Sequence, residues 1–282
     1  MTDMTQAAAL KAMVSADAAT LERHAYAQQI IRQAGEIALG MFRRRTELVI
    51  EEKGLQDMVS IADRMVEDFV RAQIAARFPD DAVVGEERGG GASDARCVWV
   101  IDPIDGTACF VNGMLAWCVS IGVLVDGQPA IGAVYDPNAD ELFHACQGLG
   151  AHVVTPQGVT RLQVNDVANL QGGVLGVGFS HRVGTDTFLP FLLDVLEEGG
   201  MFIRNGSGAL MIAYVAAGRL IGYFEPHINS WDCLAGIVLV NEAGGRCNDF
   251  LANNGLEKGN PILVGGPRLY PHLAALALPR CL

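Results

Sequence analysis

Apolar residues recur at intervals of three and four along the first third of the chain, which is the spacing of one helix face. This pattern predicts an amphipathic helix from Leu21 to about Arg44 and a second helix after Ser60, with Asp63 in its first turn. Residues 1–20 are rich in alanine and weakly patterned, so we expect a flexible N-terminal tail there.

Short apolar runs bounded by glycine, proline and aspartate predict strands in the middle of the chain. Six runs fit this description: 82–84, 98–101, 117–125, 129–135, 141–145 and 150–154. The third and fourth runs flank Asp126-Gly127, a strong hairpin signal, and the last two are also typical of a hairpin.

The second half of the chain alternates strands with helices. The predicted strands are 173–178, 201–203 and 220–224, and the predicted helices are 187–198, 206–217 and 231–243. Ser230 is a natural N-cap for the last helix. Because the elements keep no strict βαβ rhythm and no linker divides them, we expect a layered α/β fold with mixed or antiparallel sheets.

The composition narrows the class of protein. Half of the residues are hydrophobic and 18% are charged, so a large core is expected. The formal net charge of −12 argues against a nucleic-acid partner, because no basic stripe could neutralise phosphates. Seven scattered cysteines without a CxxC pair indicate free thiols in a reducing compartment. The sequence shows neither a signal peptide nor a membrane-length apolar run, so we expect a cytoplasmic protein without a membrane partner.

The segment VWVIDPIDGT, residues 98–107, ends an apolar strand on two aspartates, Asp102 and Asp105. Pro103 cannot continue a strand ladder, so the turn can bring both carboxylates to one concave face with the Ile104 carbonyl between them. Two close carboxylates repel and are costly to desolvate, and a divalent cation relieves both effects. Oxygen ligands favour Mg²⁺ over zinc. Taken alone, the segment also fits an ordinary solvated turn.

Neighbouring residues add to this metal hypothesis. Gly106 lets the backbone approach a ligand, and a helix that begins at Thr107 would present free amides to an anion. Glu86 follows another apolar strand, and Asp232 lies in the first turn of the last predicted helix. An acid at a helix start is ordinary, because it interacts favourably with the helix dipole. Four acids at the ends of separate elements nevertheless fit two metal ions that share carboxylates.

Three motifs then occur in an order typical of one enzyme family: GEE at 85–87, WVIDPIDGT at 99–107 and WDCLAG at 231–236. Two further segments match the same family: KGLQDMVSIAD at 53–63 and RNGSGA at 204–209. From about residue 21 to its C-terminus the chain therefore resembles the inositol monophosphatase family, within the Mg²⁺-dependent, lithium-sensitive phosphatase superfamily.

The resemblance implies alternating α-β-α-β-α layers and a homodimer. It also implies a single phosphatase domain over residues 21–282. Residues 21–155 would form the metal- and phosphate-binding half. Residues 156–282 would form the substrate-binding half, which carries the last metal ligand.

The resemblance also implies a role for each matching position. The metal ligands would be Glu86, Asp102, the Ile104 carbonyl, Asp105 and Asp232. Asp63 would serve a further metal position through water, and Thr107 with Glu86 would orient the attacking water. The backbone amides of Gly106 and Thr107 would bind the phosphate. The substrate site would be lined by Gly206, Ser207 and Gly208, with Glu225 as the acid that binds substrate hydroxyls. His181, Arg182 and His227 are further candidates for substrate contact.

The implied activity is hydrolysis of a small polyol or sugar monophosphate, such as inositol monophosphate, by metal-activated water without a phosphoenzyme. Two or three Mg²⁺ ions per subunit would be needed, with Mn²⁺ as a substitute. A histidinol-phosphate phosphatase, a 3′(2′),5′-bisphosphate nucleotidase and a fructose bisphosphatase share the metal motif and stay open as alternatives. A catalytically inactive metal-binding protein is another, although no acid of the motif is missing.

Cys109 departs from the family pattern, because it stands where DGTxNF commonly has asparagine. This change leaves the metal ligands untouched and bears on substrate preference. The cysteine does not indicate a thiol phosphatase, since the HCx₅R loop of those enzymes is absent from the sequence.

Overall fold

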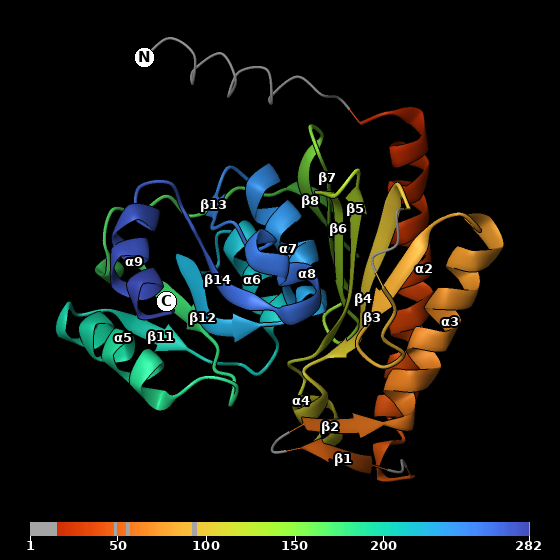
Figure 1. Ribbon diagram of the computed structural model, residues 1–282, viewed down its shortest axis with the longest axis horizontal. Coiled ribbons are helices and arrows are strands. Elements are labelled where there is room, and N and C mark those ends of the chain that lie inside the picture. The colour runs from red at the N-terminus through yellow and green to blue at the C-terminus, as the bar shows by residue number, and fades with distance from the viewer. Residues whose placement is uncertain (1–15, 48–49, 55–56, 92–94, 282) are drawn as a thin grey trace.

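The computed structural model describes residues 16–47, 50–54, 57–91 and 95–281. The chain is built in five layers: a helix pair, a seven-stranded sheet, a second helix pair, a five-stranded sheet and a third helix pair (Figure 1). Both sheets are mixed. The predicted layered α/β fold is therefore confirmed.

Helices α2 (Ala18–Phe42) and α3 (Ile61–Arg77) cover one face of the seven-stranded sheet. Helix α2 begins three residues earlier than the sequence pattern predicted, because the Asp17 carboxylate caps it by accepting the Thr20 N–H at 2.7 Å. Residues 18–20 thus belong to the helix. The expected tail over residues 1–15 lies outside the described residues.

The seven-stranded sheet keeps its strands in chain order. Its strands are β3 (Ala82–Gly85), β4 (Cys97–Asp105), β5 (Cys118–Val125), β6 (Gln128–Asp136), β7 (Glu141–Cys146), β8 (Gly150–Thr155) and β9 (Gly158–Arg161). Strands β3 and β4 are parallel, and all other neighbours are antiparallel. Both predicted hairpins, β5–β6 and β7–β8, are confirmed. The hairpin of β1 (Ile50–Gly54) and β2 (Asp57–Ser60) was not predicted.

The five-stranded sheet has the order β11-β10-β12-β14-β13. Its strands are β10 (Val174–Val177), β11 (Met201–Ile203), β12 (Gly222–Ile228), β13 (Arg246–Cys247) and β14 (Asn260–Gly265). Helices α6 (Gly208–Ala216) and α7 (Ser230–Glu242) pack between the two sheets, and α5 (Thr185–Glu197) and α9 (Tyr270–Ala277) cover the outer face. Strand β12 extends four residues beyond its predicted end and therefore includes Glu225.

The start of α7 corrects one prediction. Asn229, rather than Ser230, is the N-cap, because the Ser230 hydroxyl donates instead to the Leu256 carbonyl at 2.7 Å. Asp232 is the third helical residue and closes a capping box by accepting the Asn229 N–H at 3.0 Å. The helix start thus fixes the acid that the sequence singled out.

No helix within the described ranges is long and apolar enough to cross a membrane. All seven cysteines are free thiols, as predicted, and five of them are buried.

Candidate functional site

An irregularity in β4 brings Asp102 and Asp105 to the same face of the seven-stranded sheet. The two residues lie three apart on β4, but their partners on β5 lie only two apart. Residues three apart on a regular strand point to opposite faces. One extra residue in a bulge turns the second of them back to the face of the first. Pro103, which has no N–H to place in the ladder, lies in this bulge. Ile104 accordingly packs in the core beneath α2, while Asp105 contacts α6.

Asp232, on α7, completes an acidic cluster with these two residues. In the described part of the chain, carboxylate oxygens of Asp102, Asp105 and Asp232 all lie within 4.8 Å of one another. Asp102 is 1% exposed and Asp105 is 6% exposed. Three hard oxygen donors at this spacing suit a divalent cation such as Mg²⁺, so the residues fit the metal that the resemblance implies.

Glu86 lies at the same end of the seven-stranded sheet as Asp102. Strands β3 and β4 are parallel and Gly85 pairs with Ile101, so the residues that follow them leave the sheet side by side. The Glu86 N–H donates to the Ile101 carbonyl at 3.3 Å. Its side chain lies outside the three-acid cluster but lines the same cavity.

Asp63, Thr107 and Ile104 meet through one hydroxyl group. Asp63 is fully buried in the first turn of α3. Thr107 Oγ1 is 3.1 Å from Asp63 Oδ1 and 3.0 Å from the Ile104 carbonyl, both of which are acceptors. Helix α4 (Thr107–Val111) begins at Thr107, the start that an anion site there would require, and Gly106 precedes it at a φ of 94°, which favours glycine. Three predicted site residues are thus joined at the end of β4.

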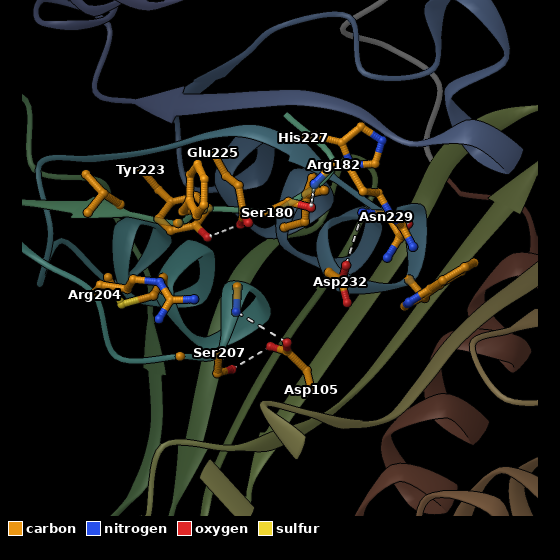
Figure 2. A pocket seen from close by; sticks show the side chains of 18 of the residues that line it. Asp105, Ser180, Arg182, Arg204, Ser207, Tyr223, Glu225, His227, Asn229 and Asp232 are labelled. Atoms are coloured by element: carbon orange, nitrogen blue, oxygen red, sulfur yellow. Dashed lines mark hydrogen bonds between the residues drawn. The ribbon is translucent and has the colours of Figure 1, made fainter. Parts of the chain in front are cut away.

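The predicted substrate segment Gly206–Gly208 also anchors Asp105. The Ser207 hydroxyl caps α6 and donates to Asp105 Oδ2 (Figure 2). The Ala209 N–H donates to the same oxygen at 2.7 Å. Gly206 and Gly208 line the cavity. The N-terminus of α6 therefore holds this carboxylate in place.

Burial raises the pKa of every acid in the cluster. For Asp102, burial acts first and the charge of Glu86 adds to it, so that its pKa lies well above the usual range. Burial and then the charge of Asp232 raise the pKa of Asp105 to about 7. Burial also raises the pKa of Asp232. A cation between the three groups would favour their ionised forms.

The cluster opens into a cavity of about 630 Å³. Glu225 on β12 lines its wall, and the Tyr223 hydroxyl donates to Glu225 Oε2 at 2.6 Å (Figure 2). The three further candidates for substrate contact also line it: His181, Arg182 and His227. Arg182 donates to the Asn229 side chain.

Sequence reasoning missed Tyr223 and Arg204, which both line the cavity. The signal for Tyr223 was its place two residues before Glu225, because alternate residues on a strand share one face. Arg204 opens the RNGSGA segment that matches the family, but it was given no role of its own. Cys109 is 3% exposed and its thiol donates to the Asn205 carbonyl at 3.3 Å. Burial raises the pKa of this thiol, which does not suit a nucleophile.

Several known proteins are similar to this chain in sequence and in architecture. The family model described as "Inositol monophosphatase family" matches residues 19–278. A curated relative, the Nus factor SuhB of Haemophilus influenzae, is 37% identical over 84% of this chain and 89% of its own length. The crystal structure of the extragenic suppressor protein suhB from Bartonella henselae has a TM-score of 0.81 at 32% identity, over 88% of this chain and 95% of that chain. The crystal structure of SaIMPase-II bound to inositol monophosphate has a TM-score of 0.75 at 29% identity, over 92% of this chain and 94% of that chain.

Proposed function

Because this chain belongs to the inositol monophosphatase family, we propose that it is a Mg²⁺-dependent phosphomonoesterase of small polyol or sugar monophosphates, such as inositol monophosphate. The observation that carries this proposal is the cluster of the buried Asp102 and Asp105 with the partly buried Asp232, of which Asp105 and Asp232 line the cavity. Burial raises the pKa of all three acids, so their ionised forms destabilise the fold unless a cation compensates them, and the cluster supports metal-dependent chemistry.

The residues around the cluster supply the remaining roles. Asp102, Asp105 and Asp232 would hold Mg²⁺, with Glu86 and the Ile104 carbonyl as further ligands and Asp63 at an additional position. Mg²⁺, or Mn²⁺ in its place, would make a water molecule more acidic and neutralise phosphate charge. The Thr107 hydroxyl, held by Asp63 and Ile104, is placed to orient that water. Within the described residues we find no side chain suited to a phosphoenzyme, and we propose direct attack by water.

The cavity wall supports a hydroxyl-bearing alcohol as the leaving group. Glu225 is a hydrogen-bond acceptor at this wall, and the cavity of about 630 Å³ has room for a sugar-sized molecule beside the cluster. Arg182 and Arg204 bring positive charge to an otherwise acidic site, where Arg182 acts on Asp232 and Arg204 on Glu225. Both features agree with a polyol phosphate ester.

A substrate panel with and without Mg²⁺ tests this proposal. The panel contains inositol monophosphate, histidinol phosphate, a 3′,5′-bisphosphate nucleotide and fructose 1,6-bisphosphate. A preference above tenfold for the nucleotide would remove the polyol assignment. Failure to hydrolyse any ester would favour the inactive metal-binding protein, an alternative in keeping with relatives that are named Nus factors.

We also propose a homodimer formed through one apolar face. This α5–β11 face consists of Leu189, Leu193, Leu196, Met201, Phe202 and Ile203, each between 37% and 65% exposed. Its leucines recur at helical spacing on α5, and β11 is an edge strand of its sheet (Figure 1). The six side chains expose on the order of 600 Å², which is large for a monomer and near the ~800 Å² per partner of a standard interface. A second copy that docks the same face would cover this surface.

We propose no nucleic-acid partner for this chain. The net charge of −12 supports this view, since phosphate contacts need clustered basic residues. Micromolar binding of a labelled RNA at physiological salt would contradict it.

A further inference from the structure

Tyr223 and Glu225 form a pair on the cavity side of β12. Alternate residues of a strand share one face, so both side chains leave the sheet in the same direction. The Tyr223 hydroxyl donates to Glu225 Oε2 at 2.6 Å, a short bond typical of a charged acceptor. Tyr223 is 2% exposed, whereas Glu225 is only partly buried. Both side chains line the cavity, and Glu225 is the more exposed of the two.

Gly176 on the neighbouring strand β10, and Gly178 just after that strand ends, make room for this pair. A Cβ atom at Gly178 would lie 2.3 Å from the Tyr223 hydroxyl and 2.2 Å from Glu225 Oε2. A Cβ atom at Gly176 would lie 2.9 Å from the Tyr223 ring. Real Cβ contacts do not reach these distances, so any side chain at Gly178 would displace the carboxylate. The absence of side chains at Gly176 and Gly178 thus leaves room for the Tyr223 ring and limits where Glu225 can point.

The hydrogen bond from Tyr223 also lowers the pKa of Glu225, whereas burial and the nearby acids raise it. Burial raises the pKa of Glu225 to about 8, and the charges of Asp232 and Asp105 add to that rise. The Tyr223 hydrogen bond acts in the other direction, because it stabilises the ionised carboxylate. Burial and the charge of Glu225 hold the pKa of Tyr223 well above its usual range, so Tyr223 remains a donor.

Glu225 keeps acceptor capacity for a ligand. Across the described residues, Tyr223 is the one hydrogen-bond donor that reaches the Glu225 side chain, and it binds Oε2. The other oxygen, Oε1, belongs to a side chain that lines the cavity. A carboxylate fixed through one oxygen presents the second in a defined direction, which is the arrangement that selects a hydroxyl by position.

We propose that Tyr223 is a positioning residue, which holds Glu225 as the acceptor for a hydroxyl group of the substrate alcohol, with Gly178 providing the space. The inference rests on the proposed function and concerns the choice of alcohol, separate from attack at phosphorus. Tyr223 acts through Glu225, since its own hydroxyl proton is donated to Glu225 Oε2.

The test compares two esters in Tyr223→Phe with Mg²⁺ present. Inositol monophosphate carries hydroxyls near the ester, and p-nitrophenyl phosphate carries none on its leaving group. We expect KM for inositol monophosphate to rise about tenfold with kcat within twofold, the usual order for a lost hydrogen bond to a charged group. Both constants for p-nitrophenyl phosphate should stay within twofold. Tyr26→Phe, which removes a hydroxyl bonded to the Gln73 carbonyl on the far helices, is the matched control.

Two further variants separate positioning from general loosening of the fold. Gly178→Ala should reproduce the ester-selective rise in KM, because the new Cβ displaces the same carboxylate. In a Glu225→Gln background, Tyr223→Phe should raise KM for inositol monophosphate by less than a further twofold, since the two changes act on one contact. Full additivity, or equal losses on both esters, would overturn the positioning role. If the wild-type protein hydrolyses neither ester, the proposed function fails and this inference fails with it.

Discussion

Replacing Asp105 by asparagine should stabilise the metal-free protein while abolishing both its response to Mg²⁺ and its turnover. Burial and the charge of Asp232 raise the pKa of Asp105 from 3.8 to about 7. An acid whose pKa is raised in the folded state is most favourable below pH 3.8, and its contribution to stability is lost as the pH rises through 7. At pH 8 the folded protein must therefore ionise a group that resists ionisation. Asparagine keeps the side-chain shape and an oxygen for the Ala209 N–H, but it carries no charge.

The size of this effect follows from the pKa difference. A rise of about three pKa units, at about 1.4 kcal/mol each, corresponds to roughly 4 kcal/mol at pH 8. Relaxation of the site reduces this figure, so we expect a gain of about 2–4 kcal/mol in the free energy of unfolding. For a chain of this size such a gain raises Tm by roughly 5–10 °C. By contrast, Mg²⁺ at 100 times its Kd should stabilise the wild-type protein by about 2.7 kcal/mol and leave the variant unchanged.

Calorimetry at pH 8 and pH 5, in chelator and in Mg²⁺, measures these quantities. The advantage of Asp105→Asn in chelator should shrink at pH 5, where the wild-type Asp105 is protonated in the folded state. Asp249→Asn, at an exposed position, is the control and should show neither effect. A lower Tm for Asp105→Asn in chelator, or a persistent Mg²⁺ shift, would refute the assignment of Asp105 to a repulsive, cation-binding cluster.

Three other outcomes follow from the structure. Glu86→Gln should lower kcat/KM by about three orders of magnitude or more, since shared metal sites fail as a unit, and near-normal steady-state rates would contradict its role as a ligand. Leu193→Glu should convert the proposed dimer into a monomer by light scattering, and an unchanged dimer mass would exclude the α5–β11 face. His24 and His144, whose ring nitrogens lie 3.1 Å apart between α2 and β7, have pKa values lowered to about 4 by burial. The unfolded chain binds these protons near pH 6.5, so stability should fall between pH 6.5 and pH 4, by about 1 kcal/mol per histidine at pH 5 because both rings are partly exposed. His144→Gln should flatten this slope in thermal unfolding, and an unchanged slope would show that other groups cause it.

Helices with a strong apolar period were predictable from the sequence, and strand β14 was not. Helix α3 was predicted because its buried residues recur at three and four positions. Strand β14 was missed, since Pro261 lies at its start and only Ile262–Val264 form an apolar run there. A proline beside so short an apolar run argues against a strand, because proline cannot donate to the ladder.

Some residues of the site could likewise be predicted from local sequence, and others depend on tertiary packing. Asp102 and Asp105 could be singled out because the motif that carries them is contiguous in the sequence. The anchoring of Asp105 by Ser207 joins residues 102 positions apart and depends on how α6 packs between the sheets. Such contacts follow from packing and leave no local pattern. Glu225 was found by resemblance alone, and its partner Tyr223 only by geometry.

The bulge in β4 is what lets two acids three residues apart in the DPID segment share one face of the sheet. Substitution of Ile104 by another aliphatic residue would keep its place beneath α2. Loss of the bulge at the same spacing would restore the regular alternation and carry the second acid through the sheet into that apolar layer. Evolution or design could therefore vary the aliphatic side chain between these acids far more freely than the bulge itself.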